Sequence, residues 1–237
     1  IAEVEVFNPL TVAILSTGNE LVEPGSAVKE GQIYNSNRYL LKGLLNSLHF
    51  DVLDLGVIPD NLESTLSALQ QAASTADLII TTGGASVGEE DYIQSAISKL
   101  GAIDFWKVAI KPGKPFMLGS INDTSVLGLP GNPGAVFVTF MILARPFLLH
   151  LQGITNTQPK PYALAINFDI KKAGIRREFL RVIRSNNRLE LHPNQSSGML
   201  SSASWAEGLA VIMEGTAPKK GDFVDFLPFD TLFSLNN

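Results

Sequence analysis

The chain has no cysteine among its 237 residues, which excludes disulfide bonds, thiolate zinc sites and a cysteine nucleophile. A protein without thiols suits a reducing cytoplasm, and we expect that location. A long uninterrupted apolar run is missing as well. Residues 135–151 form one of the longest apolar stretches, but Arg145 and Pro146 interrupt it, so we expect no membrane segment.

Basic residues are too few and too dispersed to mark a nucleic-acid-binding surface. Lysine and arginine number 18 against 23 acidic residues, which gives a formal net charge of −5, and no basic stripe with interleaved aromatic residues is present. The three histidines, His49, His150 and His192, have no metal-site spacing. The sequence therefore predicts no nucleic-acid partner and no histidine metal centre.

What the chain does have is a regular alternation of apolar strands and amphipathic helices, with 45% hydrophobic residues to build a core. We expect strands at residues 11–16, 52–57, 78–82, 103–108, 116–120 and 125–129, and helices at 36–48, 62–74, 92–100 and 133–151. Ser36 is the expected cap of the first helix, and Asn122 and Asp123 form a hairpin turn. The pattern indicates an α/β domain over residues 1–154, with a mostly parallel sheet and helices on both faces.

A polar, proline-bearing stretch at residues 155–161 is typical of a linker. After it come short alternating segments separated by turn residues. We expect strands at residues 162–168, 178–183, 188–192, 209–213 and 222–227. This pattern predicts a second, small β-barrel or sandwich domain over residues 155–237.

Three glycine-rich turns adjoin predicted strands and together describe an anion pocket. They are TTGGASVG at residues 81–88, KPGKP at 111–115 and GLPGNP at 128–133. Glycines let backbone N–H groups approach a ligand closely, a helix N-terminus adds a positive dipole, and Lys111 and Lys114 add charge. Plainer explanations remain open, because glycine pairs often serve only as tight connections and lysines in loops are often solvated.

Several carboxylates also follow predicted strands, where ligands sit in an open α/β sheet. They include Glu20, Asp60 and Asp91. Each has an ordinary alternative as a loop acid, a helix cap or a first-turn acid. Acids beside anion donors nevertheless favour a metal-assisted phosphate enzyme, with Mg²⁺ held by one or two carboxylates and substrate oxygens.

Five motifs in order extend this interpretation to a family. They are STGNEL at residues 16–21, GQIYNSN at 31–37, TGGASVG at 82–88, KPGKP at 111–115 and GLPGNP at 128–133. The set resembles the molybdopterin molybdenumtransferase family, which includes MoeA and the gephyrin E domain. RREFLR at residues 176–181 and QSSGML at 195–200 are similar to that family's β-barrel signatures, so the resemblance covers nearly the whole chain.

The resemblance implies molybdenum cofactor synthesis, in which adenylylated molybdopterin exchanges AMP for molybdate with the help of Mg²⁺. It assigns catalysis and metal binding to Glu20, Asp60 and Asp91. It assigns molybdate binding to Lys111, Lys114, Arg176 and Ser197. It assigns binding of the pterin and its phosphates to Thr17, Gly18, Gly83, Gly84, Ser86, Gly88, Gly131, Asn132 and Pro133.

Two features depart from the family pattern. Asn19 stands where relatives commonly have aspartate, which lowers the negative charge beside Glu20. Full-length relatives also carry N-terminal domains that complete the partner's site in a homodimer, and nothing here matches them. We therefore expect a C-terminal two-domain portion with incomplete activity by itself.

Two other functions remain open from the sequence. A binding-only molybdopterin module would share the glycine turns without the β domain. A nucleotide pyrophosphatase of the competence-damage type would share the α/β unit. Residues 162–228 count against the first, and the 111–115 loop with Arg176 counts against the second.

Overall fold

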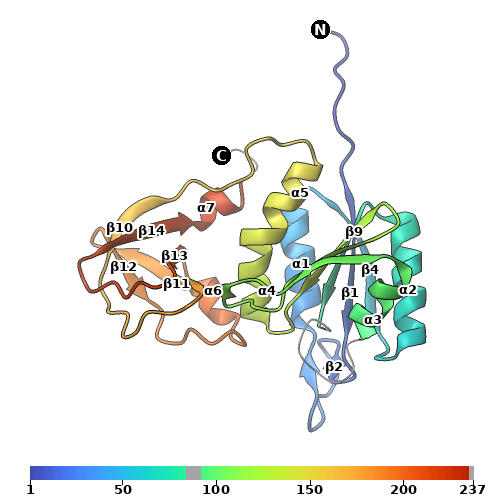
Figure 1. Ribbon diagram of the computed structural model, residues 1–237, viewed down its shortest axis with the longest axis horizontal. Coiled ribbons are helices and arrows are strands. Elements are labelled where there is room, and N and C mark those ends of the chain that lie inside the picture. The colour runs from blue at the N-terminus through green and yellow to red at the C-terminus, as the bar shows by residue number, and fades with distance from the viewer. Residues whose placement is uncertain (84–91, 235–237) are drawn as a thin grey trace.

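The computed structural model describes residues 1–83 and 92–234, and it contains a sheet and a barrel on either side of a helical layer (Figure 1). The sheet has the strand order β4-β1-β5-β9-β8-β6. Neighbours β4, β1, β5 and β9 are parallel, whereas β8 is antiparallel to both β9 and β6. The strands are β1 (Thr11–Thr17), β4 (Asp51–Ile58), β5 (Leu78–Thr82), β6 (Ala102–Trp106), β8 (Met117–Ile121) and β9 (Thr124–Leu129). The expected mostly parallel sheet is confirmed.

Helices cover both faces of this sheet, as the alternation of its side chains requires. In β1, Val12 and Ile14 pack beneath α1 (Ser36–Ser47) and the long helix, whereas Ala13 and Leu15 face α2 (Leu62–Thr75) and α3 (Tyr92–Leu100). The cap of α1 differs from the expectation, because the side chain of Asn35, not Ser36, accepts the first-turn amide of Arg38.

The long helix between sheet and barrel is continuous from Pro133 to Leu151, as α4 (Pro133–Thr139), a π-helical turn η1 (Phe140–Ala144) and α5 (Arg145–Leu151). Arg145 and Pro146 do not end it; the wider π turn immediately before them accommodates the missing N–H of proline. By length and composition alone this helix could cross a membrane, but 72% of its 18-residue apolar segment is buried inside the molecule. It is a core helix of this fold.

Hydrogen bonds explain how the charged residue Arg145 fits in that buried helix. It is fully buried, and its guanidinium donates to the carbonyl oxygens of Thr157 at 3.1 Å and Ser234 at 2.6 Å. Burial lowers the pKa of this guanidinium. The side chain thereby fastens the linker and the C-terminal segment to α5.

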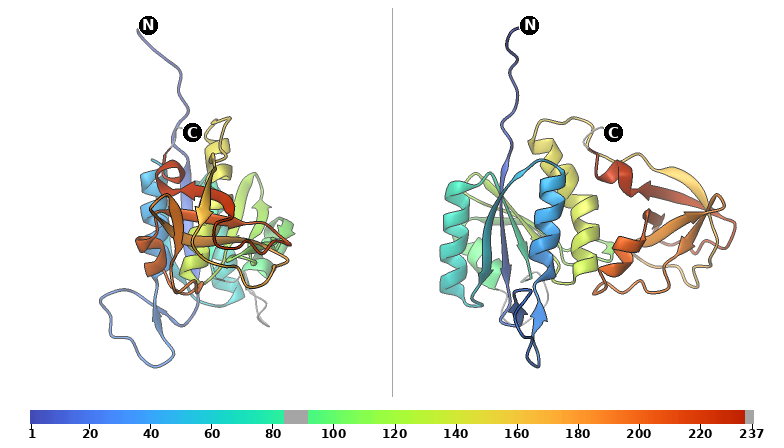
Figure 2. Two further views of the ribbon diagram at one scale, coloured as in Figure 1. Left: turned by 90° about the vertical axis from the view of Figure 1, so that its left-hand side faces the viewer. Right: turned by 180° about the vertical axis from the view of Figure 1, so that it is seen from behind.

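Five strands close into the expected barrel, in the cyclic order β12-β10-β14-β13-β11, with β11 pairing back to β12. The strands are β10 (Tyr162–Ile166), β11 (Arg177–Ser185), β12 (Arg188–Leu191), β13 (Gly208–Ile212) and β14 (Phe223–Pro228). Two short helices, α6 (Ser201–Trp205) and α7 (Phe229–Leu232), lie beside the barrel and were not predicted. A short parallel pair, β2 (Leu21–Val22) and β3 (Ile33–Tyr34), protrudes beyond the sheet (Figure 2).

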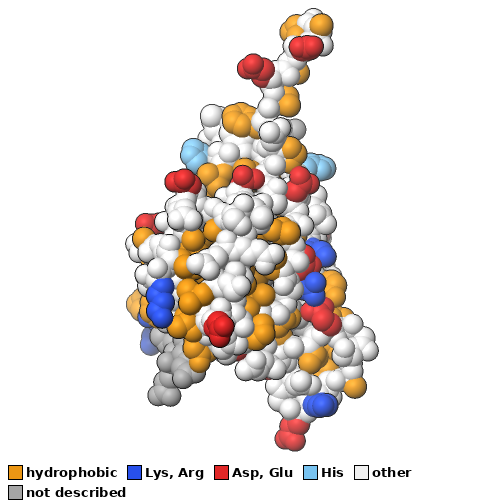
Figure 3. Space-filling view, turned by 90° about the vertical axis from the view of Figure 1, so that its right-hand side faces the viewer, with side chains coloured by type: hydrophobic (Ala, Val, Ile, Leu, Met, Phe, Trp, Pro, Cys, Tyr) orange, Lys and Arg blue, Asp and Glu red, His pale blue; other side chains and the backbone are white. Residues whose placement is uncertain are grey.

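The two parts share one hydrophobic cluster, which includes Val136 of the long helix with Phe179 and Leu209 of the barrel. A further connection is β7 (Ile110–Lys111), which belongs to the first part of the chain yet pairs with β11. The domain boundary at residues 154 and 155 stays a prediction. Away from this contact, on the face shown in Figure 3, apolar groups lie between single acidic side chains, and the basic ones lie at the margins.

Candidate anion-binding cleft

The turns that follow β1, β5 and β9 contain Gly18, Gly83 and Gly131. They meet at one edge of the sheet, which the carboxyl ends of these strands form. These strands are neighbours whose ends align, with Ser16 beside Thr82 and Thr82 beside Leu129. The chain leaves β1 for β4 on one side and returns to β5 on the other, so this edge is a topological switch point, where open α/β sheets bind ligands.

Close backbone contact there explains the glycines. Gly83 has a φ of +85°, and a Cβ on it would lie 2.8 Å from the carbonyl oxygen of Thr17. A Cβ on Gly131 would lie 4.0 Å from the Cα of Gly83. A side chain at Gly83 would therefore separate the turns that form the edge.

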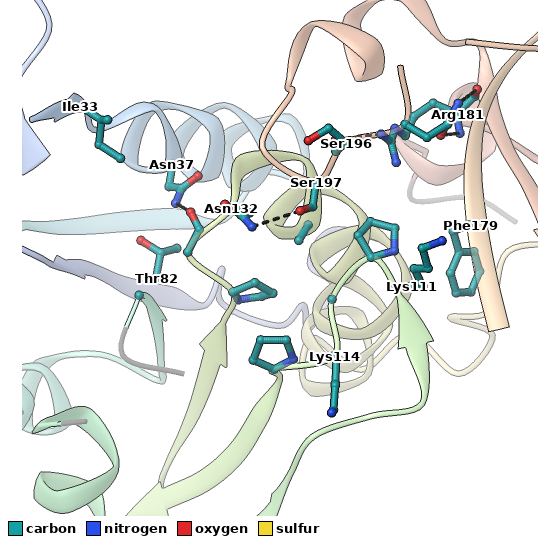
Figure 4. Close-up of a pocket in the computed structure, with 18 of the residues that line it drawn as sticks. Ile33, Asn37, Thr82, Lys111, Lys114, Asn132, Phe179, Arg181, Ser196 and Ser197 are labelled. Carbon is teal, nitrogen blue, oxygen red and sulfur yellow. Dashed lines mark hydrogen bonds between the residues drawn. The ribbon is translucent and has the colours of Figure 1, made fainter. Parts of the chain in front are cut away.

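The turns open onto a cleft of about 700 Å³ between the sheet edge and the barrel (Figure 4). One wall comes from the sheet turns and α1, and the other from β11 and the loop before α6. Predicted site residues in its lining are Thr17, Glu20, Gly83, Lys111, Lys114, Gly131, Asn132, Arg176 and Ser197. All four predicted molybdate contacts thus share one cleft, although Lys111 and Ser197 are far apart in the sequence.

Other predicted residues are not in that lining. Gly18 lies beneath Glu20, since a Cβ on Gly18 would lie 2.6 Å from Oε2 of Glu20. Pro133 begins α4. Asp60 is exposed after β4 and does not line the cleft. Gly84, Ser86, Gly88 and Asp91 fall outside the described residues.

The loop with the two lysines is held against the barrel. Lys111 lies in β7 beside Glu178 of β11, and its Nζ forms an ion pair of 2.7 Å with Oε1 of Glu178. Nη1 of Arg176 donates to the carbonyl oxygen of Ile110 at 3.3 Å. Lys114 is exposed at the cleft. The pairing of β7 with β11 therefore brings three cations from two parts of the chain to one wall.

Asn132 and Ser197 join the two walls directly. Nδ2 of Asn132 donates to Oγ of Ser197 at 3.0 Å, and the amide of Gly134 donates to the carbonyl oxygen of Ser197 at 2.8 Å. The amides of Ala135 and Val136 donate to the carbonyl oxygen of Asn132. The first amides of α4 are thus used within the protein, and the helix start fixes Ser197 in place.

Several residues that shape the cleft were not assigned a role from the sequence. Arg181 and Glu178 lie on the barrel wall, and Asn37 of α1 donates from Nδ2 to the carbonyl oxygen of Gly131 at 2.7 Å. Arg181 had a usable signal, because a charged residue between Leu180 and Val182 interrupts an apolar strand. Asn37 had none beyond its place in a motif.

Among the described residues, the cleft lining contains two acids, Glu20 and Glu178, and Glu178 is already paired with Lys111, so Glu20 is the acid that fits a cation. Among residues 1–83 and 92–234, no group of three His, Asp or Glu side chains is arranged for a metal ion. Mg²⁺ does not need such a group, because it takes one or two carboxylates and completes its shell with water and substrate oxygens. The donor set therefore suits a cation that arrives with a phosphate ligand.

Two protein families match successive parts of the chain. The family described as "Probable molybdopterin binding domain" matches residues 13–150, and "MoeA C-terminal region (domain IV)" matches residues 164–229. The molybdopterin molybdenumtransferase of Haemophilus influenzae is 47% identical over 182 residues, which are 76% of this chain and 45% of the relative. That of Staphylococcus aureus strain COL is 32% identical over 189 residues, 79% of this chain and 44% of the relative.

A solved structure supports the fold. The molybdopterin biosynthesis MoeA protein of Pyrococcus horikoshii has a TM-score of 0.80 and 31% identity, covering 93% of this chain and 55% of that one. The chain spans less than half the length of these two curated relatives. The resemblance found in the motifs is confirmed: the chain belongs to the molybdopterin-binding domain family and carries the MoeA C-terminal region behind that domain.

Proposed function

We propose that this chain carries the molybdate-insertion site of a molybdopterin molybdenumtransferase. In this reaction adenylylated molybdopterin loses AMP, and its dithiolene sulfurs take up molybdenum. The observation that carries the proposal is the convergence of Lys111, Lys114, Arg176 and Ser197 on one cleft. Cations and a hydroxyl suit a tetrahedral dianion, and the curated relatives are named for this activity.

The sheet side of the cleft suits the other substrate. Thr17, Gly83 and Gly131 present backbone and hydroxyl groups at the switch point, where phosphate-bearing ligands bind in such folds. Glu20 would hold Mg²⁺ there, and that ion would supply positive charge to the phosphoanhydride as AMP leaves. Asp60 and Asp91 remain proposed partners in this role. The barrel, with Arg176 and Ser197 in the cleft, favours this function over the two alternatives, which need only the α/β unit.

The remaining expectations belong to the same proposal. We infer a cytoplasmic enzyme that acts as a homodimer in its full-length form, with no nucleic-acid or membrane partner. The activity of this chain alone is expected to be incomplete, because it spans less than half the length of the two curated relatives.

Calorimetric titration with molybdate tests the anion site. Lys114→Ala is expected to weaken molybdate binding by about tenfold, because it removes an exposed cation from the cleft. Lys160→Ala is the matched control, since Lys160 is exposed in the linker and does not line the cleft. Equal loss in both variants would indicate non-specific attraction, and no loss in either would refute the site.

The metal proposal has a separate test. Mn²⁺ substitutes for Mg²⁺ and can be followed through water-proton relaxation, with ADP as a stable phosphoanhydride. Glu20→Gln is expected to weaken the ternary complex by about tenfold or more. Glu63→Gln, at an exposed first-turn position of α2, is the control. Retention of the ternary complex by Glu20→Gln would remove Glu20 from the metal role.

A further inference from the structure

Arg181 is a buried cation in the wall of the cleft. Its residue is only 1% exposed, yet it belongs to the lining of the cleft (Figure 4). Nε donates to Oγ of Ser202 at 3.1 Å, and Nη2 donates to the carbonyl oxygen of Ser196 at 3.0 Å. Both partners are neutral, and within residues 1–83 and 92–234 no carboxylate forms an ion pair with Arg181.

Burying a cation without an opposite charge is unfavourable. Burial lowers the pKa of the Arg181 guanidinium, and the charge of Glu178 offsets this only in part. Glu178 is already engaged, since it holds Lys111. The counter-charge that Arg181 lacks within the described protein would come from an anion in the cleft.

Arg181 also holds the turn that carries Ser197. Its side chain binds Ser196, and the side chain of Gln195 accepts from the amide of Arg181 and donates to its carbonyl oxygen. From the other side, Asn132 and the amide of Gly134 bind Ser197. The turn is therefore fixed between β11 and α4, and Arg181 is the charged part of that support.

We propose that Arg181 is a positioning residue for oxyanion binding: it holds the Ser196–Ser197 turn in place and sets a permanent positive charge behind it, with bound molybdate as its counter-ion. The inference rests on the proposed function, because it concerns the same anion. Arginine suits this role, since it stays protonated when buried and its planar fork binds two acceptors at once.

Two substitutions distinguish the effect of the Arg181 charge from the effect of its hydrogen bonds. Arg181→Met keeps most of the volume but removes the charge and both hydrogen bonds, and it is expected to raise the molybdate dissociation constant at least about tenfold. Arg181→Lys keeps the charge without the fork and is expected to raise it by about threefold. Arg184→Met is the control, because Arg184 lies on the same strand but binds Glu207 and Tyr162 outside the cleft.

Binding is measured by calorimetry with molybdate alone on the 237-residue chain, and the unfolding free energy of each variant is measured in urea. A purely structural arginine would lower stability and leave the molybdate dissociation constant of the folded variant unchanged, and that result would overturn the inference. Binding by the unsubstituted chain that is lost in Lys114→Ala but kept in Arg181→Met would overturn it while leaving the proposed function intact. An unsubstituted chain that binds no molybdate would remove the basis of both.

A readout on the unsubstituted protein covers the case in which the variants fail to fold. The Nε–H resonances of ¹⁵N-labelled arginine are recorded during a molybdate titration, with Arg184 as the internal reference. The Arg181 signal is expected to shift saturably, with the same dissociation constant as in calorimetry. If molybdate binds saturably and no arginine signal other than that of Arg176 shifts, the inference is overturned.

Discussion

Replacing Gly134 with alanine is expected to destabilise the protein, although alanine is the better helix former by about 1 kcal/mol. A Cβ at this position would lie 2.8 Å from the carbonyl oxygen of Ser197 and 3.1 Å from that of Met199. Both obstacles are backbone atoms, so a rotamer change cannot relieve them. The turn before α6 must move away from α4, and the 2.8 Å hydrogen bond from the Gly134 amide lengthens.

The magnitude follows from these contacts. Overpacking a tight contact costs about 1–3 kcal/mol, and a weakened hydrogen bond adds about 1 kcal/mol. The gain in helix propensity offsets about 1 kcal/mol, which leaves a net loss of about 2 kcal/mol. For a chain of this size that corresponds to a fall in Tm of about 4–8 °C. Molybdate binding should weaken as well, because Ser197 shifts.

Gly43 provides the matched control. It also lies inside a helix, α1, but it is exposed and a Cβ would meet nothing within 4 Å. Gly43→Ala is therefore expected to stabilise the protein by about 0.5–1 kcal/mol. Urea unfolding of both variants gives the comparison. A Gly134→Ala protein as stable as the Gly43→Ala protein would refute the close contact between α4 and the Ser197 turn.

Two further predictions concern ion pairs. Glu178→Gln frees Lys111 from its 2.7 Å ion pair and is expected to raise molybdate affinity about two- to fivefold, measured by calorimetry. Weaker binding instead would mean that the ion pair holds Lys111 in its binding position. Burial raises the pKa of Asp54, but hydrogen bonds from Lys42 and Arg38 and the Gly56 amide outweigh it, so this pKa lies below its ordinary value. Its stabilising effect is present above about pH 4 and is lost as pH falls through the folded-state pKa. Asp54→Asn should thus lower the unfolding free energy by about 1 kcal/mol at pH 7 and converge with the unsubstituted protein in acid, whereas an equal deficit at all pH values would contradict this.

Local chemistry made much of the fold predictable. The short, β-branched apolar run Leu78–Thr82 and the amphipathic period of Leu62–Thr75 favour a strand and a helix, and the structure has both within a residue of the expectation. The turn at Asn122 was predictable because asparagine tolerates its φ of +52°. The short helices α6 and α7 were not predicted, because five and four residues are too few for a helical period to appear. The long helix was expected over residues 133–151 and the structure has it there, but the π turn before Pro146 was not predicted.

The sequence by itself determined which chemistry is available: glycines for close backbone approach, Lys111 and Lys114 on a proline-bearing loop, and motifs that assign a family. Only the tertiary structure decided which residues meet. The pairing of β7 with β11 carries the lysine loop to the barrel, and α4 binds the turn of Ser197 through Asn132 and Gly134. Contacts across such sequence distances depend on how whole elements pack, which no local pattern encodes. The sequence shows Arg181 as a charged residue in an apolar strand. That it lines the cleft could be recognised only from the folded structure, because the other wall comes from distant residues.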